Sequence, residues 1–243
     1  LSHLLNSAII ISASSDIGSA MCKRWLSFGW EVVGTYRTDS KALEEIRSKG
    51  VKLVKCDLSD CSSIRNAILN LQTICRKWDV LVSCPGSQNP VGPFIDSDFD
   101  EWDKSIGVNF TGQLRFVHGL LPFRNNEHGL SPCVLFFAGG GTNNAVKNYS
   151  AYTISKIALI KMCELLDAEI PDTRFAIVGP GWVKTKIHDS TLKAKFKAGD
   201  NYKRTVVKLA GDECTPIEKV LDCCDWIIDS SRKVVSGSMT LVS

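Results

Sequence analysis

The sequence has no long hydrophobic run, no strong excess of one charge and no Cys-x-x-Cys motif. No stretch of 18 apolar residues occurs among the 243 residues, so the chain is not expected to span or bind a membrane. The 29 basic residues barely outnumber the 26 acidic ones, which argues against a nucleic-acid partner. The apolar segment 1–15 lacks a basic flank, so a strand is expected within it rather than a signal peptide.

The ten cysteines fit neither a metal site nor a disulfide framework. None forms a Cys-x-x-Cys pair, and no histidine lies at zinc-finger spacing from them, so no metal site is expected. Most lie in apolar runs, as Cys56 and Cys84 do, and an unpaired cysteine behaves as a small buried hydrophobe. Reduced core cysteines are therefore expected, and these predict a cytoplasmic location.

Short apolar runs alternate with amphipathic stretches along the whole chain. Strands are predicted at 7–12, 31–36, 51–56, 79–84, 133–138, 174–179 and 238–242, and helices at 17–28, 40–48, 61–76, 101–121, 151–170 and 215–229. The strand runs are nearly continuous Val, Ile and Leu, which is typical of strands buried on both faces of a parallel sheet. The alternation predicts an α/β fold with a doubly wound, Rossmann-type parallel sheet and helices on both faces, in a single domain over 1–243.

Two later segments carry more specific expectations. Helix 215–229 is predicted to begin with Thr215 as its N-cap and Pro216 as its first residue, with Glu218 completing a capping box. The segment 184–214 is long, polar and weakly periodic, which predicts a lid over the substrate site.

The turn after the first strand is a candidate phosphate site. It reads Ser12-Ala13-Ser14-Ser15-Asp16-Ile17-Gly18 and leads into a helix, whose backbone N–H groups and dipole favour an anion such as a dinucleotide pyrophosphate. Gly18 permits close packing of helix against strand. Taken alone, such a serine-rich turn is also explained by simple helix capping.

Six motifs in order resemble those of the short-chain dehydrogenase/reductase family, over residues 7–242. The turn is similar to that family's Thr-Gly-x-x-x-Gly-Ile-Gly pattern, and Tyr152 to Lys156 to its Tyr-x-x-x-Lys. The other four matches are Asp57-Leu58, Val82-Ser83-Cys84-Pro85-Gly86, Asn109, and Pro180-Gly181-Trp182-Val183-Lys184-Thr185.

The resemblance implies an NAD(P)(H)-dependent oxidoreductase that interconverts a carbonyl and an alcohol on a small-molecule substrate. It implies that Tyr152 is the acid–base residue, that Lys156 also holds the nicotinamide ribose and that Asn109 holds a water in a proton relay. The other cofactor residues that it implies are Ser12, Ser14, Ser15, Asp16, Ile17, Asp57, Leu58, Gly86, Pro180, Gly181, Val183 and Thr185. A homodimer or homotetramer that pairs the helices of Asn109 and Tyr152 is implied as well.

The chemistry of the Tyr152–Lys156 pair can be argued from spacing. Residues four apart on a helix share a face. A phenol with a pKa of about 10 is a poor acid–base group at pH 7. A neighbouring ammonium is expected to lower that pKa, so that the phenol can exchange a proton with a carbinol oxygen. The alternative, a surface ion-dipole pair, is less favoured because the motif follows the fifth strand.

The sequence departs from the family's pattern at three positions. Ser12 and Asp16 stand where the pattern has glycine; Ser12 narrows the turn, and Asp16 is expected to cap the helix. The family's catalytic serine falls at Gly139, which has no hydroxyl. Three alternatives remain: Thr142 replaces the serine, the substrate supplies a hydroxyl, or the protein is a catalytically weakened or silent dinucleotide-binding member.

Charge distribution bears on cofactor and substrate. Arg37 and Thr38 follow the second strand, where an acidic residue would bind a ribose 2′-hydroxyl, and they favour NADP(H) over NAD(H), although Asp39 adds a negative charge nearby. From Lys184 to Lys208 eight basic and two acidic residues give +6. Such a lid suits an anionic substrate, such as a nucleotide-sugar or a carrier-linked acyl group; a solvated helix face is the alternative. No aromatic stacking pattern accompanies the lysines, which again disfavours nucleic acid.

Overall fold

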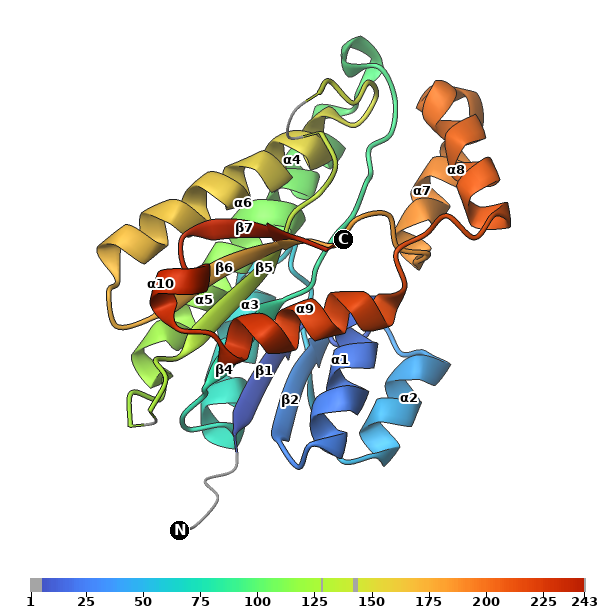
Figure 1. Ribbon diagram of the computed structural model, residues 1–243. Coiled ribbons are helices and arrows are strands. Elements are labelled where there is room, and N and C mark those ends of the chain that lie inside the picture. The colour runs from blue at the N-terminus through green and yellow to red at the C-terminus, as the bar shows by residue number, and fades with distance from the viewer. Residues whose placement is uncertain (1–5, 128, 142–143, 243) are drawn as a thin grey trace.

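A seven-stranded parallel sheet runs through the centre of the molecule (Figure 1). The computed structural model describes residues 6–127, 129–141 and 144–242. The sheet order is β3-β2-β1-β4-β5-β6-β7, which confirms the predicted doubly wound architecture. The strands are β1 (Ser7–Ile11), β2 (Glu31–Tyr36), β3 (Lys52–Lys55), β4 (Val80–Ser83), β5 (Cys133–Phe137), β6 (Arg174–Gly179) and β7 (Ser238–Leu241).

Each central strand sends alternate side chains into two separate cores. In β1, Ala8 and Ile10 pack in one core and Ile9 and Ile11 in the other, and all four are fully buried. Successive side chains of a strand point to opposite faces, so a strand covered on both faces needs apolar residues at every position. This is why the strand runs are continuous rather than alternating.

Helices cover both faces of the sheet (Figure 1). Side chains of α1, α2 and α9 pack in the first core, and those of α3, α5 and α6 in the second. The helices that the sequence predicted are α1 (Asp16–Ser27), α2 (Lys41–Ser48), α3 (Cys61–Ile74), α4 (Phe99–Ile106), α5 (Gly112–Leu120), α6 (Ser150–Glu169) and α9 (Ile217–Asp229).

The helix predicted over 101–121 is interrupted. Helices α4 and α5 are joined by a π-helical turn, Gly107–Thr111, so the chain turns more widely there than an α-helix does. Such turns often occur at functional sites. This one contains Asn109, one of the residues that the family resemblance singles out.

The predicted start of α9 is wrong in detail. The helix begins at Ile217, Pro216 occupies the N-cap position, and no side chain caps the helix. The Thr215 backbone N–H instead donates to the Trp182 carbonyl at 2.9 Å, and the Thr215 side chain lies against Gly181. Thr215, which the local pattern assigned to capping, thus packs against the Pro180-Gly181 motif instead.

The β6–α9 segment (184–214) contains helices that its weak periodicity did not predict. These are α7 (Asp189–Ala194) and α8 (Asp200–Ala210), with 3-10 turns at Lys186–His188 and Lys195–Ala198. The segment extends beyond the carboxyl ends of the strands, away from the body of the sheet (Figure 1). It buries few residues of its own, among them His188, Thr191 and Thr205.

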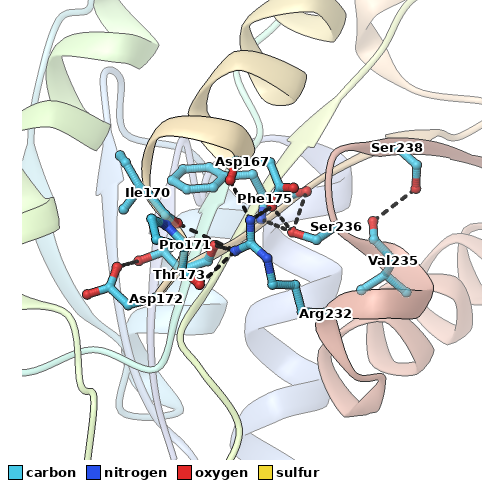
Figure 2. Close-up of polar contacts among 10 residues, drawn as sticks. All are labelled: Asp167, Ile170, Pro171, Asp172, Thr173, Phe175, Arg232, Val235, Ser236 and Ser238. Carbon is cyan, nitrogen blue, oxygen red and sulfur yellow. Dashed lines mark hydrogen bonds and ion pairs between the residues drawn. The ribbon is translucent and has the colours of Figure 1, made fainter.

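An arginine anchors the opposite end of the sheet. Arg232, at the start of the short helix α10 (Arg232–Val235), donates to the carbonyls of Pro171 and Thr173 at 3.0 and 2.6 Å and pairs with Asp167 at 2.8 Å (Figure 2). Cations at a helix C-terminus satisfy its unpaired carbonyls. This contact joins the end of α6 to the α10–β7 connection, far from the cleft described below.

All ten cysteines are free thiols, and most are buried. None of the helices in the described ranges combines the length and hydrophobicity that a bilayer crossing requires.

Candidate active site

Two connected cavities open at the carboxyl ends of the strands, beside β1 and β4. The sheet order reverses between these strands, which is where ligands bind in open α/β sheets. The turn cavity, of about 420 Å³, lies beside the first turn, and the tyrosine cavity, of about 550 Å³, lies beside Tyr152. Both are lined by the same six residues, Ile17, Cys84, Pro85, Gly86, Thr185 and Ile187. They therefore form one continuous cleft.

The first turn keeps the shape of a phosphate turn despite its serines. Ser12 adopts a left-handed backbone angle, φ +61°, and its N–H donates to the Thr35 hydroxyl at 2.9 Å. The Ser15 hydroxyl caps α1 by accepting from the Gly18 N–H at 3.0 Å. A Cβ at Gly18 would lie 2.6 Å from the Ser12 carbonyl oxygen, so only glycine lets the helix approach the turn this closely.

The prediction that Asp16 caps α1 is wrong. Ser15 is the cap, and Asp16 lies in the first helical turn. The Asp16 carboxylate instead accepts the backbone N–H of Lys186 at 2.7 Å, and the Lys186 ammonium donates to the Ser14 carbonyl at 2.5 Å. The β6–α9 segment is thereby joined to the turn, which no local pattern could have predicted because the partners are 170 residues apart.

The structure brings nearly all predicted cofactor residues to the cleft. The turn cavity is lined by Ser12, Ser14, Ser15, Asp16, Ile17, Arg37, Asp57, Leu58, Gly86 and Thr185. The tyrosine cavity is lined by Ile17, Gly86, Tyr152, Lys156, Pro180, Gly181, Val183 and Thr185. Thr38 is exposed and lines neither cavity.

At the end of β2, Arg37 lines the turn cavity, and the nearby carboxylate of Asp39 is paired with a different arginine. Asp39, expected to oppose Arg37, forms an ion pair with Arg47 at 3.5 Å. Arg37 itself forms no ion pair within the described ranges, and its exposed side chain lines the cavity. Desolvation raises the pKa of Asp57, but the N–H and hydroxyl of Ser59, with the charge of Arg37, outweigh it, so the pKa is lowered.

Lys156 is a buried cation beside Tyr152. It is 3% exposed, and its ammonium donates to the carbonyls of Phe137 at 3.0 Å and Pro85 at 3.2 Å. The ammonium lies 5.9 Å from the Tyr152 ring centroid. Burial, against a smaller opposing influence of Cys84, lowers the pKa of Lys156 to about 8.

The expected lowering of the Tyr152 pKa is not found. Burial raises the pKa of the phenol to about 12, with no compensating charge. The physical reason is the direction of the Lys156 ammonium, which is engaged by two backbone carbonyls rather than by the phenol. In this state Tyr152 is a neutral hydrogen-bond donor.

Position 139 has no room for the missing serine. A Cβ at Gly139 would lie 2.7 Å from the Tyr152 hydroxyl oxygen and 2.9 Å from Cγ of Lys156. The tyrosine therefore fills the space beside Gly139. Thr142, the predicted replacement for the serine, lies outside the described residues.

Asn109 is fully buried, and protein groups occupy its polar atoms. Its side-chain oxygen accepts the Ser87 N–H at 2.8 Å, and its amide donates to the Ser87 carbonyl at 2.8 Å and to Ser105 at 3.0 Å. The Asn109 carbonyl accepts from Gln113 at 2.7 Å. Asn109 thus fixes the loop after β4, beside the cleft, whereas sequence reasoning assigned it a water.

Sequence reasoning missed a hydrogen-bonded chain in the wall of the tyrosine cavity. The Thr191 hydroxyl donates to the side-chain oxygen of Gln88 at 2.9 Å and lies 2.7 Å from the Tyr149 hydroxyl. Because the Thr191 proton is engaged by Gln88, Tyr149 is the donor to Thr191. These residues come from three separate segments and meet only in the fold, so the sequence holds no spacing signal for them.

A stacked pair lies where the β6–α9 segment leaves the sheet. The ring centroids of Trp182 and His188 are 4.0 Å apart, and the His188 ring nitrogen bonds the Val183 carbonyl at 3.0 Å. Burial lowers the pKa of His188 below its ordinary value.

The described residues contain no cluster of three His, Cys, Asp or Glu side chains that could hold a metal ion.

The fold and its cleft define a doubly wound α/β protein with a ligand site at the strand carboxyl ends. The family model described as enoyl-(acyl carrier protein) reductase matches residues 11–243. The chain belongs to the short-chain dehydrogenase/reductase family.

Curated relatives carry dehydrogenase names. Human dehydrogenase/reductase SDR family member 2, mitochondrial, is 25% identical over 185 residues, which cover 73% of this chain and 65% of that protein. Serine 3-dehydrogenase of Rhizobium radiobacter is 22% identical over 238 residues, covering 96% of this chain and 92% of that protein. The match to the human protein therefore leaves about a third of its length unaligned.

Solved structures share the fold at low identity. The KRED1-Pglu enzyme superposes with a TM-score of 0.85 at 21% identity, covering 97% of this chain and 100% of that one. A variant of actinorhodin polyketide ketoreductase, solved with NADPH, gives 0.82 at 19% identity over 98% of this chain and 95% of its own.

Proposed function

We propose that the protein is an NAD(P)(H)-dependent oxidoreductase that interconverts a carbonyl and an alcohol, with NADP(H) preferred. One observation carries the proposal: Tyr152 and the buried Lys156 line a cavity that is continuous with the cavity of the phosphate turn. The turn fits a dinucleotide, because Gly18 lets the N-terminus of α1 lie close against the turn, where its N–H groups can bind phosphate. A Cβ at Gly18 would prevent this approach. When bound, a nicotinamide supplies or accepts the hydride.

The chain's own groups handle the proton. Tyr152 holds its proton at neutral pH, because burial raises the pKa of the phenol to about 12, and donates it to the substrate oxygen during reduction. The Lys156 ammonium, with a pKa of about 8, is the nearby acid that can return a proton to the Tyr152 phenolate, because the phenol has the higher pKa. The family resemblance also assigns Lys156 to the nicotinamide ribose, and its side chain lines the tyrosine cavity.

The preference for NADP(H) rests on Arg37. Its exposed guanidinium lines the turn cavity, while the competing carboxylate of Asp39 is paired with Arg47. A free guanidinium at the end of β2 suits a 2′-phosphate. Calorimetric titration with NADPH and NADH tests this. We expect tighter NADPH binding, lost in Arg37→Met and kept in Lys41→Met, which removes a nearby exposed cation that does not line the cavity and leaves the Asp39–Arg47 pair intact. Equal affinities would refute the preference, and no binding would refute the cofactor.

The second donor to the substrate oxygen is proposed to be Thr142. Thr142→Val should then lower kcat by about 10²-fold and leave cofactor affinity unchanged. Full activity in this variant would favour a substrate that supplies its own hydroxyl.

A catalytically weakened or silent dinucleotide-binding member is the second candidate. It is favoured by the crowding at Gly139, where the Tyr152 phenol fills the space that a serine side chain would need. A parent protein that binds NADPH but reduces no member of a carbonyl panel would support this candidate over the enzyme.

We further propose that the β6–α9 segment is a lid over an anionic small-molecule substrate. Arg204, Thr191 and His188 from this segment line the tyrosine cavity, and the segment carries a net +6 from Lys184 to Lys208. A nucleotide-sugar or a carrier-linked acyl group would satisfy that charge. Comparing kcat/KM for neutral and anionic carbonyl substrates at low and high salt measures the preference.

A homodimer or homotetramer is proposed from the outer surface of α6. Ile154 and Leu165 are 49% and 47% exposed and, eleven residues apart, lie on one stripe of the helix. A single species of monomer mass in sedimentation at micromolar concentration would refute it.

A cytoplasmic location is proposed from the ten free cysteines, since disulfides are rare in cytoplasmic proteins.

A further inference from the structure

Lys186 makes two contacts that bring the β6–α9 segment onto the phosphate turn. Its backbone N–H donates to the Asp16 carboxylate at 2.7 Å, and its ammonium donates to the Ser14 carbonyl at 2.5 Å. Both partners flank the N-terminus of α1, whose first residue is Asp16. The lysine thus lies where the turn and the helix meet.

The lysine side chain belongs to the turn cavity. Lys186 lines it together with Ser14, Ser15 and Asp16, and its side chain is exposed. An ammonium has three N–H donors, of which the Ser14 carbonyl uses one. Donors therefore remain for an anion in the cavity. Lys184, two residues earlier, is exposed but does not line this cavity.

The need for this charge follows from the composition of the turn. Asp16 places a carboxylate in the first turn of α1, where the helix N-terminus would otherwise attract phosphate. A carboxylate beside a pyrophosphate costs binding free energy through like-charge repulsion. The Lys186 ammonium lies at the same turn and opposes that charge.

We propose that Lys186 is a ligand for the pyrophosphate of the dinucleotide, supplied by the β6–α9 segment, and that Asp16 is the positioning residue that holds its backbone. The inference rests on the dinucleotide binding proposed above. Asp16, which stands where the glycine-rich pattern has glycine, thereby has a role. Its carboxylate holds the β6–α9 segment at the turn, and this segment carries the Lys186 ammonium, which compensates the charge of Asp16.

Direct binding to the intact protein tests the assignment. Calorimetry would compare Lys186→Met with Lys184→Met, which removes the same charge from the same segment outside the cavity. The ligands are NADPH and adenosine 2′-monophosphate, which lacks the pyrophosphate. We expect Lys186→Met to raise the Kd for NADPH about 10-fold and to leave adenosine 2′-monophosphate unchanged, with wild-type values for Lys184→Met and near-wild-type values for Lys186→Arg.

The outcomes separate this inference from the cofactor proposal. If the parent binds neither NADPH nor NADH, dinucleotide binding itself is refuted. If the parent binds NADPH and Lys186→Met binds it equally well, or loses no more affinity than Lys184→Met, only the Lys186 assignment is refuted. An equal loss for adenosine 2′-monophosphate would also overturn it, because the effect would then not depend on the pyrophosphate.

The positioning role of Asp16 has its own measurement. In an Asp16→Ala background, Lys186→Met should raise the NADPH Kd by clearly less than 10-fold, because the lysine is no longer held at the turn. The same 10-fold loss in both backgrounds would refute the positioning role and leave the ligand role intact. Thermal unfolding of each variant checks that the exposed substitutions leave the fold unchanged.

Discussion

The two ends of the cleft depart from the family pattern in different ways. In the turn cavity, residues have changed but the backbone shape is kept: Ser12 adopts the left-handed angle that suits glycine, and Gly18 still lets the helix approach. In the tyrosine cavity a functional group of the pattern is absent, since Gly139 has no hydroxyl. A strained residue can preserve a backbone shape at about 1–2 kcal/mol, whereas a glycine cannot donate a side-chain hydrogen bond.

The two ends of the cleft also differ in how their charged side chains are stabilised. In the turn cavity, charges are paired or exposed, as with Asp16 beside the Lys186 backbone and Arg37 in solvent reach. In the tyrosine cavity, Lys156 is buried without a carboxylate partner and is satisfied by two carbonyls. Desolvation therefore sets the direction of the pKa shifts of Tyr152 and Lys156. For Asp57 at the turn end, the hydrogen bonds from Ser59 and the charge of Arg37 together outweigh desolvation and lower the pKa.

The largest expected effect lies at the tyrosine end. Tyr152→Phe removes the proposed proton donor and should lower kcat by about 10³-fold or more, with NADPH affinity within a factor of two or so. Tyr149→Phe is the matched control, because that phenol lines the same cavity but bonds Thr191. Steady-state kinetics and calorimetry measure both. Retained turnover in Tyr152→Phe would remove the distinction between a catalytic end and a binding end.

Lys156 should leave a signature in the pH dependence of stability. The folded protein releases the Lys156 proton near pH 8, whereas the unfolded chain does so near 10.5, so the unfolded state binds more protons between these values. Stability relative to Lys156→Met should therefore rise with pH across this interval, by up to about 3 kcal/mol, because the penalty for burying the charge disappears. Denaturant unfolding at several pH values measures the difference; parallel curves for the two proteins would contradict it.

Restoring a serine at position 139 should not restore the family's apparatus. The new Cβ would meet the Tyr152 hydroxyl at 2.7 Å, so the phenol must move, and overpacking of this kind costs about 1–3 kcal/mol. We expect Gly139→Ser to lower the melting temperature without a gain in kcat. Gly140→Ser is the matched control, since nothing lies within 4 Å of its Cβ. A large rise in kcat for Gly139→Ser would show that the tyrosine end lacks only a hydroxyl.

The sheet could be predicted from the sequence because its signal is local. Apolar runs mark the strands, and burial on both faces explains the continuous runs of the central ones, as Ile9 and Ile10 illustrate in adjacent positions. The edge strands β3 and β7 keep exposed positions. The β6–α9 segment gave no such signal, because it is helical yet buries few side chains. Helix α7 has only six residues, and α7 and α8 fully bury only Thr191 and Thr205, so neither has the buried apolar face that marks helices such as α1 and α9.

The candidate site was predictable where ordered motifs mark it, and only there. Tyr152, Lys156 and the first turn lie in the cleft as expected, but capping and pairing depend on partners far along the chain. Asp16 was assigned to the helix end because its partner, the Lys186 backbone, is 170 residues away. The Tyr152 pKa was misjudged because spacing on a helix does not reveal which carbonyls hold the neighbouring ammonium.

The smallest expected effect tests whether the turn end is strained. Ser12→Gly removes a side chain from a left-handed backbone angle, which should stabilise the fold by about 1–2 kcal/mol, less the 0.5–1 kcal/mol or so by which glycine gains freedom in the unfolded chain. A net gain of up to about 1.5 kcal/mol in the free energy of unfolding, measured with denaturant, is therefore expected. The hydrogen bond from the Ser12 N–H to the Thr35 hydroxyl uses only the backbone of Ser12 and is retained.

Ser14→Gly is the matched control for that gain, because Ser14 lies in the same turn without a positive φ. Glycine there brings only the cost of unfolded-state freedom, so stability should fall by about 0.5–1 kcal/mol. Opposite signs for these two neighbouring substitutions would place the strain at Ser12 alone. If Ser12→Gly destabilised the protein as much as Ser14→Gly does, the turn would hold its serine at no conformational cost, and the departure from glycine would carry no penalty at the turn end of the cleft.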